Sequence, residues 1–202
     1  FTAASLDILS ANVQQVQERL RRPIGVENLS AYLAWADDSL PEVAFFNELA
    51  RRTGCWLLLD VNNLVVNALN AGAADPSACT FIDAISPAAV GEIHLAGHSR
   101  GHDGLVVDDH GSRVHAPVWR AHAHAIERLG PKPTLVEWDT DLPAFDLLLA
   151  EAGYLHHTLD LVERASAYQG RKTLEMIVAG ESKTGKCVEN TAARLDESAS
   201  PS

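Results

Sequence analysis

The chain has 202 residues, of which 47% are hydrophobic, and this composition indicates a globular domain with one sizeable core rather than a disordered protein. Its formal net charge of −11 disfavours a nucleic-acid partner, because phosphate binding requires a basic surface. No apolar run approaches the roughly 20 residues of a membrane span, and no signal-peptide pattern opens the chain, so we expect no membrane partner. The cysteines Cys55, Cys79 and Cys187 are far apart, which favours a reducing, cytoplasmic compartment and disfavours a thiolate metal site.

In chain order, apolar residues at helical spacing first predict an amphipathic helix over about residues 5–21. Short apolar strands then alternate with helical segments. We expect strands at 24–26, 55–59, 92–95, 105–107 and 134–136. Between them we expect a helix that ends at Gly54, and further helices over about 64–69, 77–85 and 117–129. Two more helical stretches are predicted over about 143–152 and 155–168.

This alternation, with one strand and helix about every 30 residues, indicates an α/β fold with a parallel sheet. A doubly wound sheet is the alternative, but the chain has no GxGxxG or GxxxxGK[ST] phosphate loop. We therefore predict a TIM-type (β/α)8 barrel. A complete barrel has eight units in about 250 residues, so we expect one truncated to about its last five β/α units.

The ends of the chain shape the expected domain organisation. It begins with Phe1 and its only methionine is Met176, so we expect a fragment of a longer protein. We assign residues 1–170 to a partial, metal-binding (β/α) barrel. Residues 171–202 lose the apolar periodicity and are rich in Lys, Glu, Ser, Thr and Gly, so we expect a disordered C-terminal tail.

The most apolar strand, Leu57–Leu59, is predicted to be buried on both faces, and it runs directly into Asp60, Asn62 and Asn63. The carboxyl ends of strands carry the chemistry of α/β proteins, so these residues form a candidate site. Taken alone, they are equally typical of a helix cap or an Asx-turn. Both interpretations stay open for a single strand end.

All five predicted strands end in side chains that can bind metal. These residues are Glu27; Asp60 with Asn63; His94; Asp108 with His110; and Glu137. Strands that converge at one end of a barrel would bring them into one pocket, where clustered buried carboxylates repel each other unless a cation joins them. Oxygen and imidazole ligands without thiolate suit Fe, Mn or Zn, and a bridging carboxylate allows more than one ion.

Five motifs resemble those of the multinuclear non-heme iron-dependent oxidative enzymes (MNIO). This family of xylose isomerase-like TIM barrels was long catalogued as a domain of unknown function, and it includes the methanobactin-biosynthesis iron oxidase. The motifs are RPIGVENLS, LLLDVNNLVVNALN, GEIHLAGHS, VVDDHGSRV and PTLVEWDTDLP, and the resemblance covers about residues 5–152. The ligand order also resembles endonuclease IV-like barrels, with Asn63 where the endonuclease has a histidine.

The resemblance implies a centre of two or three irons (Fe2+/Fe3+) with dioxygen as co-substrate. It implies that Glu27 bridges two irons, and that His98 is a catalytic residue close to the substrate. One iron would be held by Asp60, His94 and Glu137, and another by Asn63, Asp108 and His110. We interpret Asn62, Asp109 and Asp139 as supporting or capping groups. Two histidine ligands that the family takes from earlier strands are absent, so we expect this chain to be inactive alone.

The resemblance further implies oxidative modification of a peptide, often at cysteine, in the biosynthesis of a peptide natural product or a metal-binding peptide. A partner protein would present the substrate peptide to the enzyme. Two alternatives stay open. One is a divalent-metal hydrolase or isomerase of the endonuclease IV/xylose isomerase-like type, and the other is an inactive barrel fragment.

Overall fold

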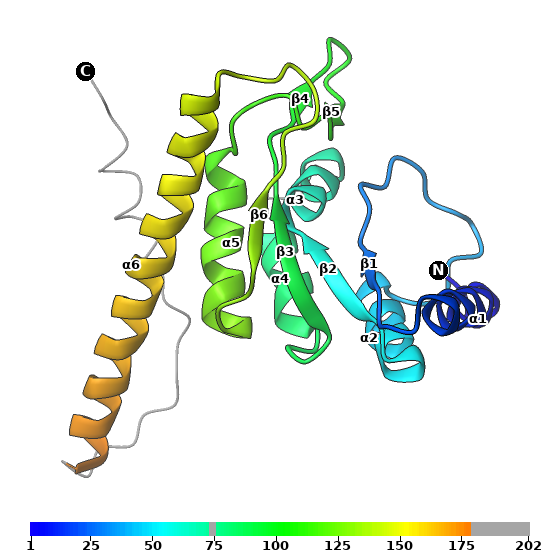
Figure 1. The fold of residues 1–202 in the computed structure, drawn as a ribbon, viewed down its shortest axis with the longest axis horizontal. Coiled ribbons are helices and arrows are strands. Elements are labelled where there is room, and N and C mark those ends of the chain that lie inside the picture. The colour runs from blue at the N-terminus through cyan, green and yellow to red at the C-terminus, as the bar shows by residue number, and fades with distance from the viewer. Residues whose placement is uncertain (73–75, 179–202) are drawn as a thin grey trace. The chain divides into compact units, whose positions relative to one another are not determined.

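The structure is a computed structural model that describes residues 1–72 and 76–178. The chain divides into two units, Phe1–Asp160 and Leu161–Ser202, and the candidate site lies within the first. The elements, labelled in Figure 1, are α1 (Ala3–Leu20), β1 (Gly25–Glu27), α2 (Glu42–Thr53), β2 (Trp56–Asp60), α3 (Val61–Asn70), α4 (Pro76–Ala84), β3 (Val90–Leu95), β4 (Ser99–Arg100), β5 (Val106–Val107), α5 (Ala116–Leu129), β6 (Thr134–Val136) and α6 (Phe145–Val178).

Helix α6 differs from the sequence prediction. It runs as one helix through the two stretches predicted at 143–152 and 155–168, and it continues over the first residues assigned to the tail. The rest of the predicted tail, residues 179–202, lies outside the described part of the chain. The boundary at residue 170 therefore stays a prediction.

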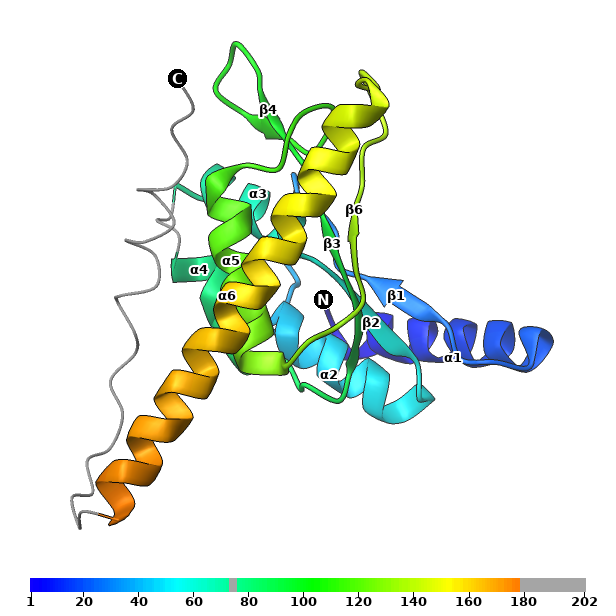
Figure 2. The ribbon, with the colours of Figure 1, turned by 60° about the vertical axis from the view of Figure 1, so that its left-hand side comes forward.

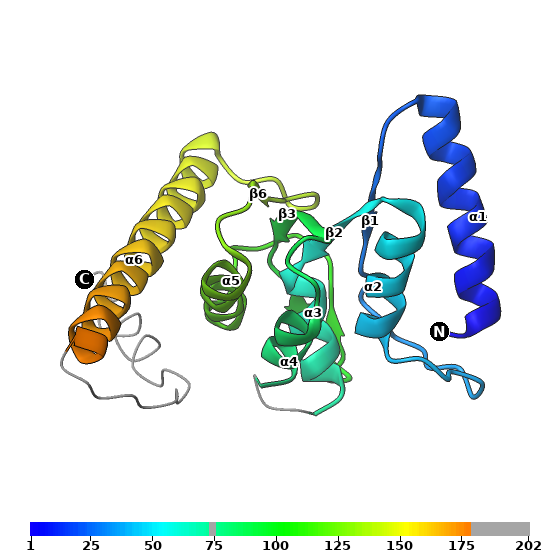
Figure 3. The same ribbon diagram turned by 90° about the horizontal axis from the view of Figure 1, so that it is seen from below.

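Four strands form a parallel sheet in the order β1-β2-β3-β6. The order of these strands in the sheet is the same as their order in the sequence, and helices lie in the connections between them (Figure 1). Helices α3, α4 and α5 pack against one another, and α1 packs against α2, as Figure 3 shows from below. The predicted α/β fold with a parallel sheet is confirmed at this level, whereas closure into a barrel stays a prediction.

The predicted strand at 105–107 is not a fifth parallel strand, and that part of the prediction is wrong. Val106–Val107 forms β5, which pairs antiparallel with Ser99–Arg100 of β4 (Figure 2). A parallel crossover needs about a dozen or more residues, and the connection from β3 to β5 is shorter. Gly104 instead turns the chain back with a φ of +85°, so the segment closes locally as a hairpin.

The two faces of the sheet differ in burial. Leu57, Leu59 and Ile93 point to one face and are almost completely buried. The opposite face carries Trp56 and Leu58, which are only half-buried, so the prediction that β2 is buried on both faces is wrong. The Trp56 ring lies where a Cβ on Gly25 or Gly91 would be. Strand β2 is therefore apolar throughout, but only one of its faces is fully buried.

Among the described residues, none of the helices combines the length and the apolar character needed to cross a membrane.

Candidate metal centre

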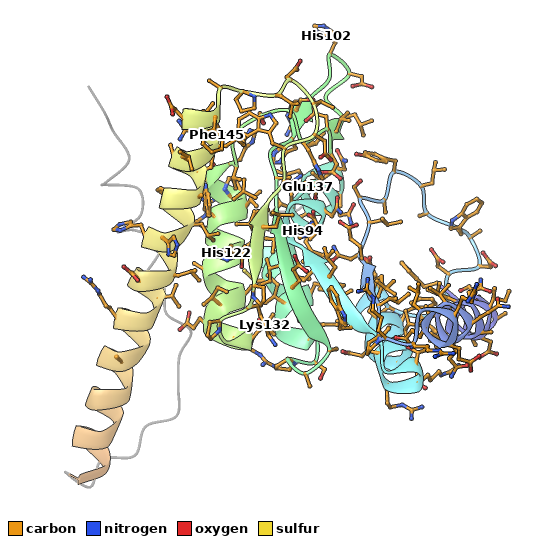
Figure 4. The ribbon with its side chains drawn as sticks, in the orientation of Figure 1. His94, His102, His122, Lys132, Glu137 and Phe145 are labelled. Carbon is orange, nitrogen blue, oxygen red and sulfur yellow. The ribbon has the colours of Figure 1, made fainter. Side chains whose placement is uncertain are left out.

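Four of the predicted ligands share the half-buried face of the sheet because of the strand register. Successive side chains of a strand alternate between faces, and directly paired residues share one. Asp60 is paired with His94, and Glu27 is paired with Leu58, two residues before Asp60. Glu137 continues this pattern beyond β6, since its N–H bonds the Leu95 carbonyl. Figure 4 labels His94 and Glu137 in this region.

These residues form a compact group, which we call the four-residue group: Glu27, Asp60, His94 and Glu137. Each offers one ligand atom, and these atoms lie within 4.8 Å of one another. His94 Nδ1 lies 3.0 Å from Glu137 Oε2. Burial raises the pKa of Glu27, an effect that the nearby His94 partly offsets. The group thus combines three carboxylates with one imidazole, a donor set that can hold a divalent cation.

Asp60 caps a helix, and one of its carboxylate oxygens has no such role. Its Oδ1 accepts a hydrogen bond from Asn63 N at 2.7 Å and caps α3, while its Oδ2 is buried without a hydrogen-bond partner among the described residues. Burial raises the pKa of Asp60 to about 7, although the bond from Asn63 N opposes the shift. An unpartnered buried carboxylate oxygen is costly, and a bound cation would satisfy it.

Asn28 holds Asp60 in place from the neighbouring strand end. Its side chain accepts from Asp60 N and donates to Asp60 O, each at 2.9 Å. The Asn28 carbonyl also accepts from the Asn63 amide at 2.9 Å, which leaves Asn63 Oδ1 buried without a hydrogen-bond partner among the described residues. Asn63 can therefore offer a fixed oxygen to a cation. Asn28 was not among the predicted site residues, since its role requires β1 and β2 to be neighbours.

A second group joins His110, Glu137 and Asp139. His110 Nδ1 lies 3.1 Å from Asp139 Oδ2 and 3.7 Å from Glu137 Oε2. A backbone bond from Asp139 N to His110 O ties the two loops together. Asp139 was interpreted as a supporting or capping group, and the structure places its carboxylate beside the ring of His110, a candidate ligand. The sequence signal was its position two residues after Glu137.

Asp108 meets the other side of the His110 ring. His110 Nε2 lies 2.8 Å from Asp108 Oδ1, and this contact raises the pKa of His110 to about 9 despite the opposing effect of burial. Burial alone would raise the pKa of Asp108, but hydrogen bonds from His110, Asn62 and Ser30 outweigh it and lower the pKa. Asp108 and His110 are thus brought together as predicted, although they follow a hairpin strand rather than a parallel one.

His98 joins neither group. It is buried, its Nδ1 lies 2.8 Å from Asn62 Oδ1, and its Nε2 lies 3.1 Å from His115 Nδ1. Both ring nitrogens of the predicted catalytic residue are therefore engaged by protein. His115 was not among the predicted site residues, because it lies in no strand-end motif.

Gly97 allows the segment before His98 to approach the loop at Ser112. A Cβ at position 97 would overlap the backbone oxygen and the hydroxyl of Ser112. We expect Gly97→Ala to lower the free energy of unfolding by about 1–3 kcal/mol, the usual cost of overpacking. Urea unfolding checks this, with Gly153→Ala in α6 as the control, because a Cβ there meets nothing within 4 Å. Equal stability of Gly97→Ala and the parent would contradict the expected overlap.

Fold and site together define a parallel α/β domain with a candidate metal centre at the carboxyl ends of its strands. The chain belongs to the family described as "RiPP precursor modification enzyme MbnB/TglH/ChrH", whose model matches residues 1–160. The resemblance drawn from the five motifs is therefore confirmed. RiPPs are ribosomally synthesised, post-translationally modified peptides, so the family description is that of peptide-modifying enzymes.

The chain is also similar to curated proteins named UPF0276. The chain is 48% identical over 160 residues to a UPF0276 protein of Caulobacter sp. (strain K31), covering 78% of this chain and 57% of the relative. It is 47% identical over 152 residues to a UPF0276 protein of Chromobacterium violaceum, covering 75% and 54%. A UPF0276 protein of Vibrio vulnificus is 42% identical over 155 residues, covering 75% and 52%. The chain thus spans about half the length of these relatives.

Proposed function

We propose that this protein is an iron- and dioxygen-dependent enzyme that oxidatively modifies a peptide, often at cysteine, in the biosynthesis of a peptide natural product or a metal-binding peptide. The family description, which names RiPP precursors as what is modified, supports a peptide substrate. We further propose that a partner protein presents this peptide to the enzyme in the cytoplasm.

The observation that carries the proposal is the four-residue group with its unpartnered Asp60 Oδ2. In the proposed assignment, Asp60, His94 and Glu137 would hold one iron, and Glu27 would contribute to this iron and to a neighbouring one. Asn63, Asp108 and His110 would hold a further iron. When bound, iron supplies the activation of dioxygen and the one-electron chemistry that amino-acid side chains lack.

The protein's own residues would prepare this centre. Asp60 and Glu27 supply negative charge that balances the cations, and Asn28 keeps Asp60 from turning away. Asp139 accepts from His110 Nδ1, so His110 would keep its Nδ1–H and offer the Nε2 lone pair once a bound metal displaces the Nε2 proton. Proposed ligands on separate strands are in this way held by a shared set of hydrogen bonds.

Metal loading under nitrogen tests the proposal on this chain. The protein is titrated with ferrous ion, and separately with zinc, and thermal unfolding is followed by circular dichroism. We expect ferrous ion to raise Tm in a concentration-dependent way, because a ligand that binds only the folded state stabilises it. We also expect air to convert the bound ferrous ion to ferric ion, observed by Mössbauer spectroscopy.

Two outcomes would overturn the proposal. Binding of zinc alone, with iron failing to stabilise the protein, would favour the divalent-metal hydrolase or isomerase. The absence of stabilisation by either metal would favour an inactive barrel fragment.

A further inference from the structure

A chain of hydrogen bonds runs behind the candidate metal centre and ends on Asp108. Its four links are Ser112 Oγ to His115 Nε2 at 3.3 Å, His115 Nδ1 to His98 Nε2 at 3.1 Å, His98 Nδ1 to Asn62 Oδ1 at 2.8 Å, and Asn62 Nδ2 to Asp108 Oδ1 at 2.6 Å. We call it the Ser112–Asp108 chain. Ser112 at its outer end is half-buried, whereas Asn62 and His98 are buried.

The carboxylate end fixes the direction of the three links between Asp108 and His115. An ionised carboxylate can only accept hydrogen bonds, so Asn62 must turn its NH2 group toward Asp108. The same NH2 group lies 3.4 Å from the Gly97 carbonyl, a second acceptor that requires this orientation. The Asn62 carbonyl oxygen therefore faces His98, and His98 must donate to it from Nδ1.

The two histidines then have determined tautomers. A neutral imidazole has one N–H, so a His98 protonated at Nδ1 presents a lone pair at Nε2. That lone pair accepts from His115 Nδ1–H, and His115 Nε2 in turn accepts from the Ser112 hydroxyl. Burial, together with the adjacent His115, lowers the pKa of His98 to about 4, which agrees with a neutral ring at pH 7.

This arrangement differs from ordinary core packing of two histidines. Their ring centroids lie 4.2 Å apart, so they are in contact, but the three links from His115 to Asp108 also point the same way, toward a proposed metal ligand. With both nitrogens engaged, His98 cannot exchange a proton with a substrate unless one link breaks. Its Nδ1–H instead donates a hydrogen bond to the buried Asn62 side chain.

We propose that His98 and His115 are positioning residues, which act through Asn62 to hold the Asp108 carboxylate in place. The consequence for metal binding rests on the proposed function, in which Asp108 is a ligand. The consequence for tautomers does not, because it follows from the hydrogen bonds of the protein without metal. The two can therefore be tested separately.

The first test is nitrogen-15 NMR of the histidine rings in the metal-free protein at pH 7. We expect His98 and His115 each to show one tautomer, protonated at Nδ1. A His98 ring protonated at Nε2, or one that averages between both tautomers, would overturn the proposal.

The second test compares three variants. His115→Leu removes the donor to His98, His115→Asn keeps an N–H group near the position of Nδ1, and His102→Leu makes the same change at the exposed His102 of the hairpin (Figure 4). We expect His115→Leu to shift the nitrogen-15 signal of His98 Nε2, which loses its hydrogen-bond donor, while Asn62 keeps His98 protonated at Nδ1. We also expect His115→Leu to weaken ferrous binding about 10–100-fold, as loss of a group that supports a ligand usually does. The other two variants should keep the parent's signal and affinity.

The outcomes separate the two proposals. If His98 and His115 show the expected tautomers but the protein binds no iron, the Ser112–Asp108 chain is supported and the proposed function is overturned. Iron binding with equal His98 Nε2 signals and equal affinities in His115→Leu and His102→Leu would overturn the positioning role. A thermal melting curve for each variant checks that it is folded under the conditions in which its iron affinity is measured.

Discussion

Replacing Asp60 with asparagine is expected to abolish metal binding by the four-residue group while the fold is kept. Asparagine is as good an N-cap residue as aspartate, so the bond from Asn63 N that begins α3 can persist. The variant loses the negative charge and one of the three carboxylates that we propose as ligands of one ion. The loss in affinity should exceed the roughly 100-fold that follows from removing a mere supporting group. Iron content after loading with ferrous ion under nitrogen and gel filtration measures it.

The matched control is Asp103→Asn. Asp103 is an exposed acidic residue of the hairpin that belongs to neither candidate group, and its Oδ1 accepts a local bond from Leu105 N. The two variants have the same net charge, so a difference between them cannot come from overall electrostatics. An unchanged iron stoichiometry in Asp60→Asn would contradict the proposed ligand role of Asp60.

The same substitution is expected to change how the stability of the metal-free protein depends on pH. The pKa of Asp60 is about 7 in the folded protein, against 3.8 as its ordinary value. Between these values the folded state binds more protons than the unfolded state, so the Asp60 contribution to stability falls as pH rises. The full shift corresponds to on the order of 4 kcal/mol. Asp60→Asn has no such titrating group. Its free energy of unfolding, relative to that of the parent, should therefore rise by up to this amount between pH 4 and pH 8.

Other groups titrate in this range, which is why the comparison with the variant is needed. Burial lowers the pKa of His98 and of His122 to about 4, so their contributions to stability rise from about pH 4 to pH 6.5 and oppose that of Asp60. His110, with its pKa raised to about 9, loses its contribution only above about pH 6.5. Urea unfolding at a series of pH values gives the free energy of unfolding of the parent and of the variant. The histidine contributions are common to both proteins, so they cancel to first order in the difference. If the free energy of unfolding changes with pH in the same way in both proteins, the pKa of Asp60 is not raised by folding.

The main site residues could be predicted because strand ends follow from local sequence. The apolar run Leu57–Leu59 predicts a strand, and once such strands are parallel, the residues after them meet at one edge of the sheet. Register then explains why Glu27, Asp60 and His94 share a face. None of this requires knowledge of the loops.

The errors arose where partners are set by distant parts of the chain. Leu105–Val107 is apolar and strand-like in either environment, and only the short connection from β3 indicates a hairpin. Asp139 and His115 matter because loops bring them to His110 and His98, and one of those loops depends on a left-handed residue, His110, with a φ of +48°. Sequence spacing gives no signal for such a turn at a non-glycine residue.

The most direct test of the central claim is anomalous X-ray scattering at the iron absorption edge, on crystals of the protein loaded with ferrous ion under nitrogen. We predict an iron peak within bonding distance of Asp60 Oδ2, with Glu27, His94 and Glu137 as its other neighbours. Iron that binds elsewhere, or a four-residue group that stays free of iron in crystals soaked to saturation, would contradict it.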